Sequence, residues 1–210
     1  MALFNIFRKG SSSFMSSILN VLGMAVAFAA FYIILVQVNY DLNFNKGIKD
    51  SEKIFVMSSG SMDGDADKRQ LNFCRPLAEI ILEASPNIEC GGCLMFSTSE
   101  ESRYWIERDG AKQDIDLSVT RFSGNALTTL GFEAVSGSLE DLDYNSFAIS
   151  ETIAHKFNLE VGMCLGYDIY ENIWTIKAIF KDMPENSHFR DIAVVRNICD
   201  EQIANFSEWG

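Results

Sequence analysis

The stretch ILNVLGMAVAFAAFYIILVQV, Ile18–Val38, decides the architecture of this chain. It runs for 21 residues, and only Asn20 and Gln37 within it carry clearly polar side chains. An α-helix rises about 1.5 Å per residue, so a helix of this length spans roughly 30 Å, the thickness of the hydrocarbon core of a bilayer. The sequence therefore predicts one transmembrane helix near the N-terminus.

The charges on either side of this stretch predict its orientation. Arg8 and Lys9 precede it, and the next charged residue is Asp41. By the positive-inside rule we expect the N-terminus in the cytoplasm, the helix in a bacterial inner membrane, and the residues from 41 onward outside the cytoplasm. The segment Ala2–Lys9 predicts a short amphipathic helix that lies at the cytoplasmic interface before the span.

Two other interpretations of the apolar stretch stay open. A cleaved signal peptide also begins with basic residues, and Ala27-Phe28-Ala29 resembles a cleavage site, although the apolar run continues past it. A buried helix of a soluble core is the second alternative, for which 31 residues without a charge, from 10 to 40, would be long.

The charge of the remaining chain excludes one class of partner. The first 38 residues contain two basic residues, Arg8 and Lys9, and no acidic residue. Residues 39–210 therefore carry 15 basic and 29 acidic residues. Nucleic acid requires a basic surface, and this surface has the opposite sign. The 16 Phe, 3 Trp and 6 Tyr supply enough apolar area for a folded core. We therefore expect a folded acidic domain without a nucleic-acid partner.

The five cysteines include one C-x-x-C pair, Cys90-Gly91-Gly92-Cys93. Such a pair can be a redox centre or half of a zinc site. A strand over Ile88–Phe96 would place the two Cys about 10 Å apart, too far for a disulfide, and only a turn at the two Gly would bring them together. We interpret them as small residues on or beside a strand.

Hydrophobic periodicity and turn residues predict an α+β domain after the helix. The Ser58–Asp67 stretch predicts a loop, Asp109-Gly110 a hairpin turn, and Ser150 the cap of a helix. The expected helices are a helix opened by Arg75-Pro76 and stopped by Pro86, then Asn125–Leu130 and Glu151–Phe157. The expected strands are Ile54–Ser58, Ile88–Phe96, Arg103–Arg108, Gln113–Val119, Phe132–Val135, Phe147–Ile149, Cys164–Tyr170, Ile173–Lys181 and one that begins with Ile192–Val195.

Four finer expectations concern the ends and the packing of these elements. The strand that begins at Ile192 has no evident partner, and Val38–Lys49, with no Pro and one Gly, predicts a helix that continues past the bilayer as a stalk. The two remaining expectations are apolar faces: Leu77, Ile80, Ile81 and Ala84 on the helix after Arg75, and Trp174, Ile176, Ala178 and Phe180 on one face of the strand Ile173–Lys181.

Motifs that would indicate an enzyme are missing from the sequence. It contains no G-x-x-x-x-G-K-[ST], no G-x-S-x-G and no H-E-x-x-H. Asp63, Asp65 and Asp67 begin like a calcium loop, but Lys68 stands where Gly is needed and Cys74 where a bidentate Glu is needed. We interpret Ser187-His188 as part of the turn cluster 184–188. The sequence therefore predicts no catalytic, cofactor-binding or metal-binding residues and no enzyme activity.

Several segments, in this order, resemble the N-terminal part of the MacB/FtsX-like ABC-transporter permease family, in the subgroup whose ATPase is a separate polypeptide. They are Phe4–Ile34, Asp41–Asn45 (DLNFN) with Ile54-Phe55-Val56, Leu130–Gly137 (LGFEAVSG), Phe147–Phe157 (FAISETIAHKF), Trp174–Phe180 (WTIKAIF) and Lys181–His188 (KDMPENSH).

The resemblance implies a permease subunit that works as a homodimer with a separate ATPase and in contact with lipid. Such a permease acts by mechanotransmission: ATP binding by the partner moves an extracytoplasmic domain instead of pumping a solute through a pore. The later spans and the second half of the porter lobe are absent, so we expect the N-terminal portion of a longer permease. The implied divisions are a cytoplasmic segment 1–10, the helix and start of the stalk 11–40, a porter-like lobe 41–121, an inserted β-rich lobe 122–183 and the start of the second porter half 184–210.

A single-span sensor whose outer domain binds a small molecule is the main alternative function. A membrane-anchored enzyme is a third, which the missing site chemistry disfavours.

Overall fold

The computed structural model describes residues 2–57, 75–95, 102–108, 110–167 and 173–197. The predicted loop Ser58–Asp67, with its three alternating Asp, lies outside these ranges, as does Asp109 of the hairpin turn. The chain divides into two compact units, Met1–Phe44 and Asn45–Gly210, and each is described by itself. The finer division of the second unit into lobes stays a prediction.

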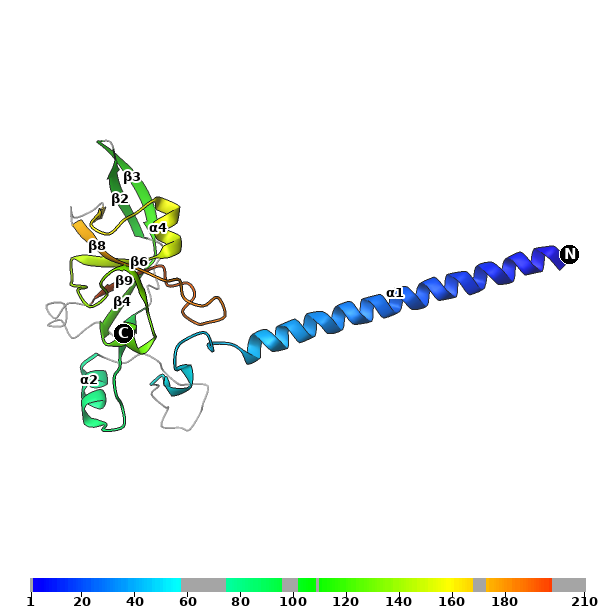
Figure 1. Cartoon of the computed structure of the whole chain (residues 1–210), viewed down its shortest axis with the longest axis horizontal. Coiled ribbons are helices and arrows are strands. Elements are labelled where there is room, and N and C mark those ends of the chain that lie inside the picture. The colour runs from blue at the N-terminus through cyan, green and yellow to red at the C-terminus, as the bar shows by residue number, and fades with distance from the viewer. Residues whose placement is uncertain (1, 58–74, 96–101, 109, 168–172, 198–210) are drawn as a thin grey trace. The chain divides into compact units, whose positions relative to one another are not determined.

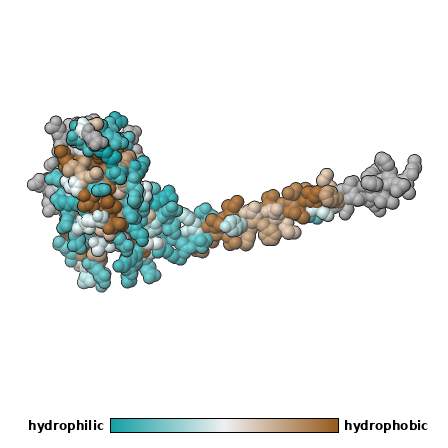
Figure 2. All heavy atoms as spheres, turned by 45° about the horizontal axis from the view of Figure 1, so that its top comes forward, coloured by the Kyte–Doolittle hydropathy of each residue, from teal (hydrophilic) through white to brown (hydrophobic). Residues whose placement is uncertain are grey.

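The first unit is one helix, α1 (Ala2–Leu42), drawn in blue in Figure 1. Within its stretch Phe14–Leu42, the most apolar window of 18 residues has a mean hydropathy of 2.4, and none of that window is buried. Figure 2 shows this surface as largely apolar. The helix is therefore long and apolar enough to cross a membrane, and it is not a core helix of this chain. A signal sequence would have the same length and composition, so that alternative stays open.

The expectations about the two ends of this helix have different outcomes. Residues 2–9 are helical, as expected, and they continue into the apolar stretch without a break. At the other end the helix stops at Leu42, and no helical stalk reaches Lys49. The side chain of Asn43 there donates to the backbone oxygen of Asn39 at 2.8 Å. Asn45 then adopts a left-handed conformation with φ 62°, which a right-handed helix cannot continue through.

The described residues of the second unit form a nine-stranded sheet with three short α-helices, which confirms the predicted α+β class. The strand order is β1-β4-β9-β6-β8-β7-β2-β3, and β5 pairs with β8 beside this path. The strands are β1 (Gly92–Met95), β2 (Ser102–Arg108), β3 (Ala111–Leu117), β4 (Val119–Gly124), β5 (Ala134–Gly137), β6 (Ser146–Ser150), β7 (Cys164–Tyr167), β8 (Ile173–Phe180) and β9 (Val194–Asn197). The helices are α2 (Arg75–Ala84), α3 (Ala126–Thr129) and α4 (Glu151–Phe157), with a 3₁₀ turn at Ser51–Lys53.

The last strand, β9, corrects the expectation that it lacks a partner. It pairs in parallel with β4, where Val119 faces Val194, and antiparallel with β6, where Ala148 faces Val195. Val194 and Val195 are fully buried. The missing partner was β4, because the predicted strand Gln113–Val119 ends at Leu117 and a new strand starts at Val119.

Two hydrophobic clusters cover the two faces of the sheet. Cluster A contains Phe122, Ala148, Phe180 and Val195, with Ile48 from the start of the unit. Cluster B contains residues of β6, β8 and β9 and also of the hairpin β2–β3, at the far end of the strand order. The sheet therefore curls around cluster B, and α4 packs there through Ala154.

A β-bulge at Lys177 corrects the predicted face of β8. In the pairing with β6, Phe147 faces Ile176 while the next residue, Ala148, faces Ala178, so Lys177 is the extra residue. Trp174 and Ile176 consequently belong to cluster B, and Ala178 and Phe180 to cluster A. All four side chains are buried, but they do not share one face.

Two further elements differ from expectation. Helix α2 forms as predicted, but its buried residue is Ala78, whereas Leu77 and Ile80 are 44% and 61% exposed. Residues 54–57 form no strand, and Phe55 is 86% exposed. Within the described part of the chain, no strand lies beside residues 54–57 to supply the hydrogen bonds that a β pattern needs.

Helix α4 has the predicted bounds and is held at both ends. The Ser150 hydroxyl accepts from the backbone N–H of Ile153 at 3.3 Å, as the sequence predicts for an N-cap. At the other end Arg108 of β2 donates to the backbone oxygens of Phe157 and Asn158. The hairpin β2–β3 is thereby fixed to the end of α4.

We expect Ser150→Ala to lower the free energy of unfolding by about 1 kcal/mol, because the Ile153 N–H loses its acceptor in a partly buried site. The measurement is urea unfolding of the full chain in detergent, followed by tryptophan fluorescence. Ser136→Ala on the exposed face of β5 is the matched control and should change stability little. Equal effects of the two substitutions would contradict the capping role.

Candidate coupling site

The residues that follow α1 in sequence bind to the turn 184–188 of the second unit. The backbone N–H of Asn45 donates to the backbone oxygen of Asn186 at 2.8 Å. The side-chain oxygen of Asn45 accepts from the backbone N–H of His188 at 3.0 Å. We call residues 45–48 together with 184–188 the clasp. One residue thus holds two points of a turn about 140 positions away in the chain.

Gly47 allows the two segments of the clasp to approach each other closely enough to form these hydrogen bonds. A Cβ at Gly47 would lie 2.7 Å from Cβ of Pro184, closer than any two such atoms approach. Ile48, the next residue, is 5% exposed and belongs to cluster A, together with Met183 and Phe132. The clasp therefore combines two hydrogen bonds of Asn45 to backbone groups with the burial of the Ile48 side chain in the core of the domain.

The turn 184–188 is itself braced from inside. The Ser187 hydroxyl, 2% exposed, donates to the backbone oxygen of Pro184 at 2.8 Å and accepts from the N–H of Phe189 at 3.2 Å. This confirms that Ser187-His188 belongs to a turn, because the hydroxyl is used to close it. A buried hydroxyl with both functions satisfied stabilises the turn geometry that Asn45 requires.

Asp182 connects the same segment to α4. Its carboxylate accepts from the Thr152 hydroxyl at 2.7 Å and from the Thr152 backbone N–H at 3.2 Å. A carboxylate at the first turn of a helix meets unsatisfied N–H groups and the positive end of the helix dipole. Through Asp182, Met183 and the turn, the clasp is therefore linked to both clusters of the sheet.

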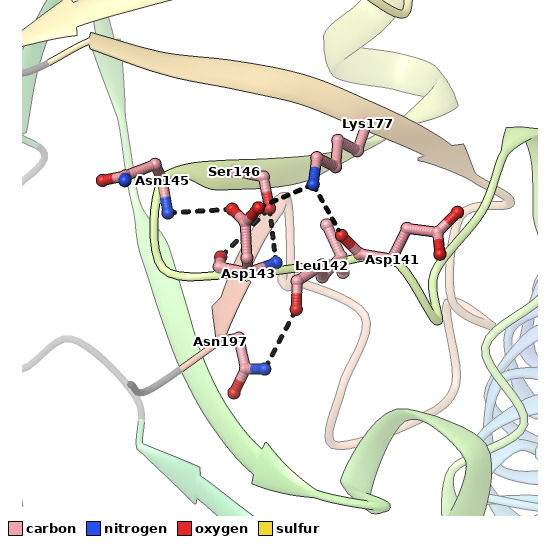
Figure 3. A network of polar contacts seen from close by, with 7 residues as sticks. All are labelled: Asp141, Leu142, Asp143, Asn145, Ser146, Lys177 and Asn197. Atoms are coloured by element: carbon pink, nitrogen blue, oxygen red, sulfur yellow. Dashed lines mark hydrogen bonds and ion pairs between the residues drawn. The ribbon is translucent and has the colours of Figure 1, made fainter. Parts of the chain in front are cut away.

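A second polar network holds the loop before β6 against the bulge of β8 (Figure 3). The Lys177 ammonium donates to the Asp143 carboxylate at 2.7 Å and to the backbone oxygen of Asp141 at 2.9 Å. The fully buried Ser146 hydroxyl accepts from the Asp143 N–H and donates to the Asp143 backbone oxygen. Asn197 of β9 donates to the backbone oxygen of Leu142 at 3.0 Å.

The bulge also explains why the last residue of β5 is a glycine, Gly137. A Cβ at Gly137 would lie 2.0 Å from the backbone oxygen of Lys177, and Gly137 has φ 76°. Glycine is the residue that combines such a close approach with a positive φ. The last residue of the segment Leu130–Gly137 thus fits against the extra residue of β8.

The hydrogen bond from Lys177 holds the pKa of the Asp143 carboxyl below its ordinary value. Both side chains are partly exposed to water, Lys177 by 35% and Asp143 by 59%, so the ion pair contributes modestly to stability. The chemistry of the two networks is structural: hydrogen bonds and one ion pair that fix loops.

Three cysteines in the described ranges are free thiols: Cys90, Cys93 and Cys164. Cys93 lies in β1 opposite Ser123, and the sulfur of Cys90 lies 3.3 Å from the Thr129 hydroxyl. The strand starts at Gly92, later than the predicted Ile88. The C-x-x-C pair is therefore not a disulfide in this structure.

Sequence reasoning gave no role to Asn45, Asp182 or the bulge at Lys177. The segments on which the resemblance depends nevertheless meet at these points. Asn45 ends one of them, Gly137 ends another, and Lys177 and Asp182 belong to the last two. A signal existed in Asn45-Lys46-Gly47, since Asn and Gly together favour turns with positive φ. Its partner, 140 residues away, could not be read from the sequence.

Comparison with known proteins adds evidence on the fold. No protein-family model matches the sequence, and no curated protein matches it. A solved domain of a protein described as a permease, from Porphyromonas gingivalis, aligns with a TM-score of 0.50 and 20% identity, over 74% of this chain and 59% of that one. The periplasmic region of MacB from Actinobacillus actinomycetemcomitans aligns with a TM-score of 0.43 and 11% identity, over 67% of this chain and 62% of that one.

The first of these likenesses confirms the α+β fold that the resemblance implies, a fold found in a permease domain. At 20% identity the comparison concerns the fold. This chain spans 59% of the length of that domain, so the activity and partners of a whole permease are matters for proposal.

We expect Asn45→Ala to destabilise the second unit by about 1–3 kcal/mol, because it removes an acceptor and strains a left-handed backbone. Asn45→Gly tolerates the backbone conformation and loses only the side-chain bond, so its effect should be smaller. Urea unfolding of the full chain in detergent measures both. If Asn45→Ala and Asn45→Gly were both neutral, the clasp would not stabilise the domain.

The Lys177–Asp143 pair predicts a pH dependence. A carboxyl whose pKa is lowered by folding contributes stability above its unfolded pKa and loses it as pH falls through its folded pKa. Lys177→Met should therefore destabilise the chain at pH 7, and its deficit against the wild type should shrink below about pH 4. Unfolding free energies of both chains from pH 7 to pH 3 test this. A deficit independent of pH would mean that the ion pair with Asp143 contributes nothing and that Lys177 acts through its hydrogen bond to the Asp141 backbone oxygen and through packing.

Proposed function

We propose that this chain is the N-terminal portion of an ABC-transporter permease subunit that acts by mechanotransmission. In this proposal α1 crosses the inner membrane and residues from about 41 onward lie outside the cytoplasm. A separate ATPase hydrolyses ATP, and the resulting movement of the permease displaces the outer domain. The observation that carries the proposal is the clasp. It occurs in a unit whose fold is similar to that of a solved permease domain.

The clasp supports this mechanism because it binds residues 45–48, which follow the helix in sequence, to the turn 184–188 of the same unit. Two residues, Asn43 and Phe44, separate the end of α1 from Asn45. A pull at this point acts on two hydrogen bonds and on the buried Ile48, and then on cluster A. Asp182 extends the connection to α4 on the other face. A flexible tether would instead let the helix move without moving the domain.

The remaining parts of the proposal concern partners. The working unit would contain a second copy of the permease and the separate ATPase, both in contact with membrane lipid. In this proposal the ATPase activity belongs to the separate partner, and the chain itself has no enzymatic role and no cofactor. The lobes 41–121, 122–183 and 184–210 are the proposed moving parts.

Inserting a short flexible Gly/Ser segment between Phe44 and Asn45 should uncouple the domain from the helix. We expect ATP hydrolysis by the reconstituted complex to continue while ATP-dependent movement of the outer domain is lost. The measurement is the distance between spin labels at Val135→Cys on the two copies, in chains whose native Cys are replaced, with and without ATP. Val135 is 56% exposed, so a label should be tolerated there.

The matched control carries the same insertion after Gly110, at the exposed tip of the hairpin β2–β3. In this control, ATP should change the distance between the spin labels as it does in the wild type. A wild-type distance that ATP does not change would refute the mechanism. An insertion at 44 that leaves the movement intact would refute the role of the clasp.

A further inference from the structure

Residues 54–57 carry the two most exposed large apolar side chains in the part of the chain that the structure describes. Phe55 is 86% exposed and Val56 73%, more than any large apolar side chain described on α1. Within the described ranges, the backbone of neither residue is in a helix, a strand or a hydrogen bond. Neighbouring side chains of an extended backbone point to opposite sides, so both sides of this segment are bare.

This exposure limits what can cover the segment. A contiguous exposed apolar surface marks a contact with another protein or with a membrane. A single added strand would bind the backbone of residues 54–57 but would leave both faces open, because strands pair edge to edge. A fluid apolar phase surrounds whatever enters it, and it can therefore cover Phe55 and Val56 together.

The segment follows closely on the end of α1. Tyr40 and Phe44 form a ring pair there, with centroids 6.0 Å apart, and aromatic residues at the end of a span mark the level of the lipid headgroups. From Asn45 three consecutive turns, each closed by a backbone hydrogen bond over three residues, lead to Ile54. Each such turn spans less than about 7 Å, so Ile54 lies within roughly 20 Å of Asn45. Phe55 is thus within reach of the same headgroups.

The charge of this part of the chain also suits a membrane. Residues 45–57 contain three Lys and two acidic residues, whereas residues 58–210 contain 12 basic and 26 acidic residues. An acidic surface is repelled by lipid phosphates, and residues 45–57 lack that excess of acid. Lys53 is paired with Asp50 at 3.2 Å, and the contact with lipid needs no unpaired lysine because it is apolar.

We infer that the side chains of Phe55 and Val56 enter the interfacial layer of the bilayer that α1 crosses, as a second membrane contact of the chain. Their backbone stays at the depth of the headgroups, where water reaches it, because an unpaired N–H or C=O is costly in hydrocarbon. Only one part of the proposed function is required, that α1 crosses the membrane. Neither the ATPase nor mechanotransmission is needed for this contact.

Spin labels measure the contact in the full chain, reconstituted in vesicles of phosphatidylethanolamine and phosphatidylglycerol, with the native Cys replaced. Single labels are placed at Phe55→Cys, Val56→Cys and Val135→Cys. Oxygen, which enters lipid, is compared with a water-soluble nickel chelate as the relaxation agent. We expect the labels at 55 and 56 to be reached by oxygen and shielded from the chelate. The label at Val135, a 56% exposed apolar residue of β5, is the matched control and should be reached by the chelate.

An added charge should remove the contact. Val56→Asp in the chain labelled at 55 should expose that label to the chelate and reduce its contact with oxygen, because a carboxylate is expelled from an apolar layer. Val135→Asp is the control substitution and should leave the label at 55 unchanged. Both side chains are well exposed, so the domain should tolerate either substitution.

Four results would overturn the lipid contact. Labels at 55 and 56 that the chelate reaches would place the segment in water. Labels shielded from both agents would mean that protein covers it, either a second copy or another part of the permease. A label at 55 that Val56→Asp leaves in lipid would exclude entry of Val56. A label at Leu35→Cys checks α1: if it is in lipid while the label at 55 is in water, only the second contact fails. If it is not in lipid, the membrane insertion of the proposed function fails as well.

Discussion

The pair of hydrogen bonds from Asn45 to the turn 184–188 is the contact on which the functional interpretation depends. It uses the N–H and the side-chain oxygen of one residue and requires a left-handed backbone that most side chains avoid. The partner turn is closed by Ser187 and joined to α4 by Asp182. Without these contacts the segment after the helix would be a tether. With them it is part of the domain, and Ile48 belongs to its core.

The bulge at Lys177 has a comparable role within the sheet. Apolar side chains of β8 before the bulge lie on one face of the sheet, and those after it lie on the other. Trp174 therefore belongs to cluster B and Phe180 to cluster A. Lys177 then holds the loop before β6, and Gly137 fits against its backbone oxygen. A bulge thus connects the two cores, as is common where a sheet must curl.

Local features of this fold could be predicted from the sequence, and long-range ones could not. The apolar length of Ile18–Val38, the cap at Ser150 and the bounds of α4 follow from residues close together in the chain. The pairing of β9 with β4 depends on residues about 75 positions apart, and alternation cannot reveal a partner. The apolar face of α2 was assigned by periodicity, but the structure buries Ala78 instead.

The candidate site was less predictable for the same reason. The turn at 184–188 was expected, whereas its binding to Asn45 was not, because the contact is made by an Asn side chain and backbone groups. The bulge at Lys177 has no local signature, since the alternating apolar residues of β8 also fit a regular strand.

Amide hydrogen exchange of the full chain in a lipid bilayer tests the central claim most directly. If the clasp holds residues 45–48 to the domain, the amides of Asn45 and Ile48 should exchange on the order of tenfold or more slowly than that of the exposed Phe55. Exchange of Asn45 and Ile48 as fast as that of Phe55 would mean that the helix ends in a free tether, and it would contradict the account.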